Sequence, residues 1–93
     1  MAYRIALRPS AQRQLGKLHG PMSVALHGAL LTLADNPRSR GAIELAGAQG
    51  LWRVRIHISG ASWRVIYRID DRTQTVLVLR VVPRDEGTYR RLR

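Results

Sequence analysis

The chain has 93 residues, enough for one domain with a modest core but too few for a catalytic domain plus a separate regulatory one. Apolar residues make up 45% of the sequence and charged residues 24%, which excludes a wholly disordered basic tail. Sixteen Lys and Arg residues stand against six Asp and Glu residues, and the resulting formal charge of +10 predicts an acidic partner.

The residue types also limit the chemistry. Fifteen of the sixteen cations are arginine, which suits phosphate binding, although a GC-rich coding bias would give the same excess. The absence of cysteine excludes disulfides and thiolate sites, and the three histidines are too scattered for a metal-site signature. We therefore expect no metal and no cofactor.

No apolar run reaches the length of a signal peptide or a membrane span. The simplest expectation is a cytoplasmic protein without a membrane partner. No repeat, low-complexity tract or linker divides the sequence, so residues 1–93 are interpreted as a single domain.

The N-terminal part predicts one strand and two helices. Residues 3–8 alternate apolar and polar side chains in the manner of a strand, and Pro9 ends it. Ser10 is the expected N-cap of a short helix that reaches Leu18, and Pro21 suits the first turn of a second helix. The second helix has a broad apolar stripe, composed of Met22, Ala25, Leu26, Ala29, Leu30 and Leu33.

The segment after the second helix begins at Asp35–Pro37, which stops the helix. Residues 38–50 contain three glycines and no sustained period, so we expect a connecting loop. Ile43 and Leu45 are expected to point inward from it.

The C-terminal half predicts three antiparallel strands. Residues 51–58 and 63–69 alternate around a turn at 59–62, and a second turn precedes a strand at 75–82 that Pro83 ends. The inward positions of the hairpin are Trp52, Val54, Ile56, Ile58, Trp63, Val65, Tyr67 and Ile69. The predicted fold is α+β, in the order β-α-α-β-β-β, with a helical hairpin on one face of a twisted antiparallel sheet and the other face open.

Arginine is concentrated on the face that this arrangement leaves open. That face carries Arg53, Arg55, His57, Arg64 and Arg68. Arg80 joins them if strand parity, the regular alternation of side chains between the two faces, holds through Val82. Neighbouring cations on a sheet repel each other, so a bound polyanion such as nucleic acid would explain the cluster. Solvated strand arginines are an equally weighted alternative.

Four segments together resemble the RelE/ParE superfamily of toxins from type II toxin–antitoxin systems, RelE-like branch. They are YRIALRPSAQRQLGKL, LADNPRSRGAIELAG, LWRVRIHISGASWRVIYRIDD and VLRVVPRDEGTYRR, and their order and spacing are specific. The resemblance covers almost the whole chain and implies the fold expected above.

The resemblance implies a ribosome-dependent mRNA endoribonuclease that inhibits translation. RelE-type toxins cleave mRNA in the ribosomal A site without metal, and the 2′-hydroxyl of the substrate is the nucleophile. The expected partners are the ribosome, its mRNA and a small acidic antitoxin. In a hetero-oligomeric complex the antitoxin would cover the basic face or displace the C-terminal tail.

The residue roles also come from the resemblance. Arg64 and Arg84 would clamp the scissile phosphate, and Tyr89 would accept the 2′-hydroxyl proton if nearby arginines lower its pKa. Arg53 and Arg55 stand where the best-known members carry lysine, so they would stabilise charge but serve poorly as proton shuttles. The remaining face residues would bind RNA, and they are Arg68, Arg80 and His57. His57 is also a possible acid or base, although a surface role is the simpler interpretation.

Two alternatives remain open. A ParE-like toxin would poison DNA gyrase by protein contact, with the same fold but without the nuclease residues. A non-cleaving relative would hold nucleic acid through its arginines alone.

Overall fold

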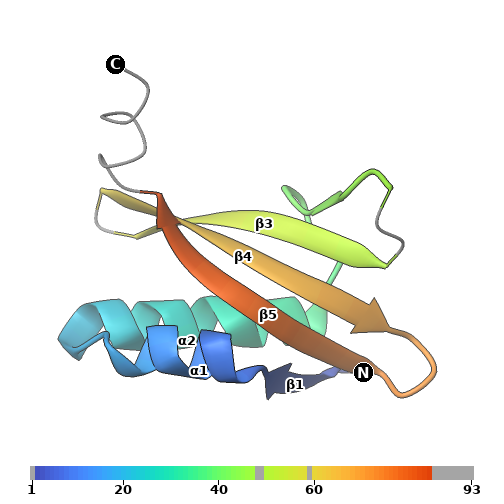
Figure 1. Ribbon diagram of the computed structural model, residues 1–93, viewed down its shortest axis with the longest axis horizontal. Helices are drawn as coiled ribbons and strands as arrows, with labels where there is room; N and C mark the ends of the chain where they lie inside the picture. The colour runs from blue at the N-terminus through green and yellow to red at the C-terminus, as the bar shows by residue number, and fades with distance from the viewer. Residues whose placement is uncertain (1, 48–49, 59, 85–93) are drawn as a thin grey trace.

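The computed structural model describes residues 2–47, 50–58 and 60–84, with the side chain of Arg84 excepted. Seven elements succeed one another along the chain (Figure 1). They are β1 (Arg4–Leu7), α1 (Pro9–Gly16), α2 (Gly20–Asp35), β2 (Ile43–Glu44), β3 (Leu51–Ile58), β4 (Ala61–Asp70) and β5 (Thr75–Arg84). The predicted order is confirmed, with the short strand β2 as an addition.

The sheet is mixed, where the sequence predicted an antiparallel one. Its strand order is β1-β5-β4-β3-β2, and β1 pairs in parallel with β5. The other three pairings are antiparallel. A parallel neighbour needs a long crossover connection, and the two helices after β1 are part of it. Residues Thr75–Val78 of β5 are therefore flanked on both edges.

The helices cover one face of the sheet (Figure 1), as predicted, and the core lies between the two layers. Each apolar layer contributes fully buried side chains, and the largest of them are Tyr67, Leu26, Val65, Val76 and Val78. The inward positions expected on β4 are all buried, namely Trp63, Val65, Tyr67 and Ile69. Neither helix is long and apolar enough to cross a membrane, within the residues that the structure describes.

The first helix starts two residues earlier than predicted. Pro9 occupies its first turn and Arg8 is the N-cap residue, without a side-chain hydrogen bond. Ser10 is therefore inside the helix, because proline has a fixed φ suited to that turn and needs no N–H partner there. The helix also ends at Gly16 and does not reach Leu18. The second helix has the predicted limits, with proline in its first turn and Asp35 at its end.

The connection after α2 was only partly predicted. Ile43 forms β2 opposite Arg53 and is 49% exposed, so the expectation that it points inward was wrong. Register explains the error, because a residue paired with Arg53 shares its outward face. Leu45 is half-buried, and its N–H donates to the carbonyl of Leu51.

Two strand limits also differ from the prediction. The turn between β3 and β4 is shorter than expected, because Ala61 and Ser62 already pair with β3. Pro83 does not end β5, which continues to Arg84. Proline is tolerated there because β1 pairs with β5 only as far as Val78, so one edge of β5 needs no donor at this point.

Hydrogen bonds fasten the loop after α2 to the end of the sheet. The Tyr67 hydroxyl donates to the carbonyl oxygen of the buried Pro37 at 2.6 Å, and burial raises the pKa of Tyr67 to about 12. The next residue, Arg38, donates two hydrogen bonds to Asp71, at 2.8 and 3.2 Å. The Tyr3 hydroxyl donates to the same carboxylate at 2.7 Å.

These contacts link the start of β1, the loop after α2 and the turn after β4. The Arg38 guanidinium and, to a smaller extent, the Tyr3 hydroxyl hold the pKa of Asp71 below its usual range. Arg38 also lies 5.6 Å from the ring centroid of Trp52, a cation–π distance. Sequence reasoning missed this cluster, since its members are far apart in the chain.

Replacing Tyr67 with Phe tests the loop attachment. The variant keeps the ring in the core but leaves the Pro37 carbonyl without its donor, so the free energy of unfolding should fall by about 1 kcal/mol. Urea denaturation of both proteins measures the difference. An unchanged free energy of unfolding would show that the hydrogen bond adds no net stability.

Candidate nucleic-acid interface

Strand register places the predicted arginines on the open face of the sheet. Arg55 pairs directly with Arg64 across β3 and β4. One step along, Arg53 pairs with Ile66, and Ile66 pairs with Arg80 on β5. Arg68 lies one further step along β4, and His57 lies at the opposite end, paired with Ser62. All six predicted side chains of β3, β4 and β5 therefore share one face.

Arg80 reaches this face for a reason that the sequence did not show. The pairing shifts between Ile66 and Tyr67, so that Ile66 pairs with Arg80 while Tyr67 pairs with Val78. Leu79 is the extra residue of a β-bulge, and it reverses the parity of the later residues of β5. Strict alternation of side chains along β5 would have placed Arg80 on the inward face with Val78. The predicted location of Arg80 was therefore right, although the alternation is interrupted at Leu79.

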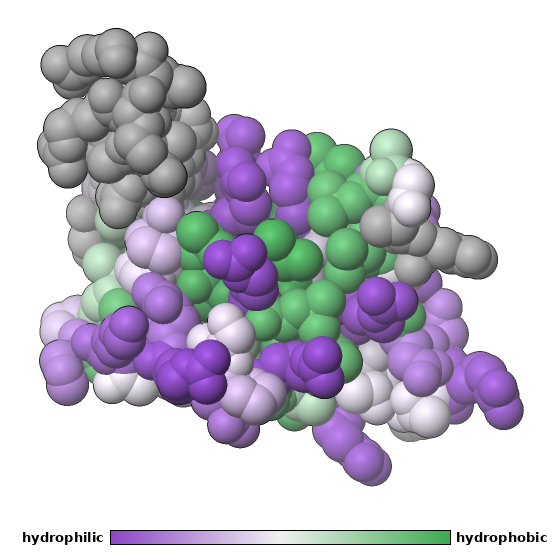
Figure 2. Space-filling model, viewed as in Figure 1, coloured by the Kyte–Doolittle hydropathy of each residue, from purple (hydrophilic) through white to green (hydrophobic). Residues whose placement is uncertain are grey.

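The arginine and histidine side chains on this face are accessible. Those of Arg55, Arg64, Arg68, Arg80 and His57 are exposed, and that of Arg53 is half-buried. Figure 2 shows hydrophobic side chains framed by hydrophilic ones over the strands. Each apolar member of the open face pairs with an arginine, and these members are Ile43, Leu51, Ile66, Leu77 and Val82.

The remaining two candidate residues are less fully placed. The backbone of Arg84 pairs with Ser62, which puts its position on the open face in the row of His57. Tyr89 lies outside the described residues. The structure thus brings together the backbone positions of every predicted site residue except Tyr89.

Electrostatics favour an anion on this face. Among the described side chains the one ion pair joins Arg38 to Asp71 and involves none of the open-face arginines. Guanidinium groups without a carboxylate partner are free to bind phosphate oxygens in a forked geometry. Within the same part of the chain, no three His, Asp or Glu side chains gather into a group that could hold a metal ion.

The two tryptophans do not belong to this interface. Trp63 is 6% exposed in the core, and Trp52 is half-buried under Arg38. Core packing was the predicted role of both, and their inward orientation is confirmed. Neither ring is available on the open face to stack on a base.

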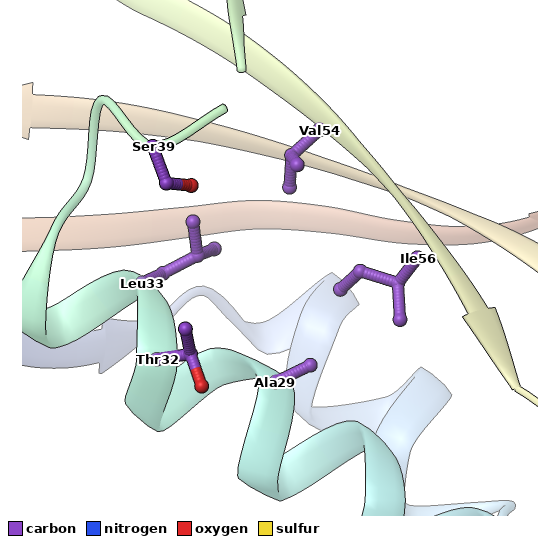
Figure 3. Close-up of a pocket in the computed structure, with 6 residues that line it drawn as sticks. All are labelled: Ala29, Thr32, Leu33, Ser39, Val54 and Ile56. Carbon is purple, nitrogen blue, oxygen red and sulfur yellow. The ribbon is translucent and has the colours of Figure 1, made fainter. Parts of the chain in front are cut away.

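A hollow of about 180 Å³ lies on the helix side of the sheet, between α2 and β3 (Figure 3). Its lining consists of Ala29, Thr32, Leu33, Ser39, Val54 and Ile56. None of these side chains titrates near neutral pH or carries a charge. The hollow therefore lacks the groups that phosphate chemistry needs.

Repulsion across the open face gives a testable consequence. Arg55 and Arg64 are directly opposite each other, a placement that brings their Cβ atoms within about 5 Å. Arg55→Thr should therefore raise the free energy of unfolding by about 0.5 kcal/mol at low salt. The gain should shrink in about 1 M salt, where the screening length is roughly 3 Å.

The matched control is Arg4→Thr, which removes an exposed strand arginine that pairs with Thr75 and not with a cation. Urea denaturation at both salt concentrations compares the variants. If Arg55→Thr changes stability no more than Arg4→Thr, the face carries no significant repulsion.

Comparison with known proteins identifies relatives of this arrangement. Residues 5–87 match the family described as the ParE toxin of the type II toxin–antitoxin system parDE. No functionally curated protein matches the chain significantly.

Solved structures show the same fold. A chain of the toxin–antitoxin complex RelBE2 from Mycobacterium tuberculosis is 30% identical, with a TM-score of 0.74 over 90% of this chain and 100% of that one. The free RelE toxin mutant of E. coli is 21% identical, with a TM-score of 0.73 over 98% and 93% of the two chains. The chain matched in the archaeal RelE–RelB complex from Pyrococcus horikoshii is 23% identical, with a TM-score of 0.69 over 90% of this chain and 97% of that one.

Proposed function

The chain belongs to the ParE toxin family of type II toxin–antitoxin systems, and from the geometry of its open sheet face we propose that it acts as a ribosome-dependent mRNA endoribonuclease. The observation that carries the proposal is the register of β3, β4 and β5. It gathers Arg53, Arg55 and Arg64 on one open face, with the position of Arg84 at its end. Binding to a protein does not in itself require such a concentration of guanidinium groups, none of which pairs with a carboxylate among the described side chains.

The proposed reaction uses the RNA itself as nucleophile. The 2′-oxygen attacks the adjacent phosphorus and loses its proton, while the bond from phosphorus to the 5′-oxygen breaks and that oxygen takes up a proton. A cyclic phosphate and a free 5′-hydroxyl result. The transition state carries extra negative charge on the phosphate oxygens, and guanidinium groups stabilise that charge.

Each residue then has a proposed role. Arg64 and Arg84 hold the scissile phosphate, and Arg55, directly opposite Arg64, adds positive charge beside them. Tyr89 accepts the 2′-hydroxyl proton. His57, one step along the strand pair from Arg55, donates a proton to the leaving oxygen. Histidine suits this role because it exchanges protons near neutral pH, whereas arginine stays protonated.

The proposal also names partners. The RelBE2 structure from M. tuberculosis and the RelE–RelB structure from P. horikoshii are toxin–antitoxin complexes. We propose a cognate antitoxin whose acidic segment covers the open face and blocks phosphate binding in a hetero-oligomer. Action on translating ribosomes places the active toxin in the cytoplasm.

A second candidate is inhibition of DNA gyrase, which the match to the ParE toxin family favours. In that case the toxin acts by binding a protein, and its toxicity does not depend on RNA cleavage at the open face. The two functions therefore differ in what an arginine substitution does.

The test compares Arg64→Ala with Arg13→Ala, a matched control that removes an exposed arginine of α1. Wild type and Arg13→Ala should arrest growth on induction and cut a translated message, as primer extension detects. Arg64→Ala should cleave about 10²- to 10³-fold more slowly, the effect of losing one transition-state donor.

Retained toxicity in Arg64→Ala would contradict the nuclease proposal. Inhibition of gyrase supercoiling by the same protein would then assign the second function. RNA binding by wild type without any cleaved product would identify a non-cleaving relative.

A further inference from the structure

Ile66 lies in the middle of the open face, surrounded by cations. Arg53 and Arg80 pair with it from the two neighbouring strands, about 5 Å away. Arg64 and Arg68 precede and follow it on β4 at two residues' distance, about 7 Å along the strand. An apolar side chain thus has four arginines around it on the same face.

The core does not account for this isoleucine. Ile66 points away from the helices, because both of its strand neighbours, Val65 and Tyr67, are fully buried on the other face. Its side chain is only half-buried. The position would accept a polar β-branched residue at little cost to the core, so its apolar character needs another explanation.

The β-bulge completes the surrounding ring. In regular pairing Leu79 would lie opposite Ile66 and Arg80 would face inward, so the β5 side of Ile66 would have no cation. Bulges commonly re-aim a side chain next to a functional site. The fold therefore departs from regular pairing at the step that brings Arg80 beside Ile66.

The alternation of side chains indicates what kind of group fits. Leu51 and Leu77 flank Arg68 in the next row of the face, as Arg53 and Arg80 flank Ile66, so apolar and cationic side chains alternate along β4 and across these two rows. An amphipathic protein helix needs a continuous apolar stripe, which this pattern interrupts with arginine. A single-stranded nucleic acid alternates apolar base faces with phosphates, and it matches the pattern.

We propose that Ile66 and the arginines around it form a seat for one unpaired nucleobase. The base lies on the Ile66 side chain, as bases lie on apolar side chains in other pockets, and the arginines bind the phosphates on either side. The inference rests on the proposed function in taking RNA as the ligand, and it adds a base-binding position that holds the strand next to Arg64.

Base pairing blocks this seat. In a duplex each base is stacked between its neighbours and its faces are unavailable, so only the phosphates can reach the arginines. The Ile66 contact should therefore contribute to the binding of single strands and not to that of duplexes.

The test uses Ile66→Thr, which keeps the β-branched shape and should fold normally, as circular dichroism verifies. Leu31→Ala is the control, because Leu31 is a 66% exposed apolar residue on α2. The probes are a short oligouridine, an RNA duplex of the same length and inorganic polyphosphate at fixed salt. Ile66→Thr should weaken oligouridine binding about fourfold, the effect of roughly one lost methylene contact, and leave the other two unchanged.

Ile66→Phe provides a second variant with the opposite expectation, since a ring offers a larger stacking surface to the base. It should bind oligouridine at least as tightly as wild type. If all three proteins bind oligouridine equally, the base seat is wrong. It is also wrong if Ile66→Thr weakens the binding of the duplex or of polyphosphate as much as that of oligouridine, since the effect would then not depend on an unpaired base.

The outcome is separable from that of the nuclease test. If oligouridine binding depends on Ile66 but no mRNA is cleaved, the base-binding proposal stands and the nuclease proposal is contradicted. If mRNA is fully cleaved but oligouridine binding does not depend on Ile66, the nuclease proposal stands and the base-binding proposal is contradicted.

Discussion

The buried face of β4 is the constraint on which the rest of the structure depends. Val65 and Tyr67 are fully buried against the helices, which fixes which face of the strand points inward. The residues between and beside them, Arg64, Ile66 and Arg68, are then held on the open face. Slipping the register by one residue would bury these cations, so the repelling arginines cannot separate without loss of the core.

The same core explains why a polyanion site suits this sheet. Adjacent cations such as Arg55 and Arg64 lower stability slightly, and the described part of the face offers no carboxylate that pairs with them. A rigid scaffold that holds unpaired guanidinium groups in place requires little reorganisation when phosphate binds. Stability and binding are therefore opposed at these positions.

Much of the fold could be predicted from the sequence because its periodicity is strong. The alternation of β3 and β4 predicted the correct inward residues, and the two prolines Pro21 and Pro37 marked the ends of α2. Other features depend on pairing between distant segments. The parallel pairing of β1 with β5, the two-residue strand β2 and the contact between Arg38 and Asp71 have no local signal.

The candidate site was predicted in a similar way. Alternation alone placed Arg53, Arg55 and Arg64 on one face, and the register confirms it. The bulge at Leu79 could not be foreseen, because a run of β-branched residues and leucine carries no mark of the extra residue. For the same reason the position of Ile66 between Arg53 and Arg80 emerges only from the three-dimensional pairing.

Amide chemical-shift mapping of the labelled protein with a short single-stranded RNA tests the central claim most directly. If the open face binds RNA, the largest shifts should lie in β3, β4 and β5 around Arg55, Arg64 and Ile66, and they should weaken as salt rises. Resonances of the outer side of α2, around Val24 and Leu31, should stay in place. Shifts confined to the helices, or none at all, would contradict the account.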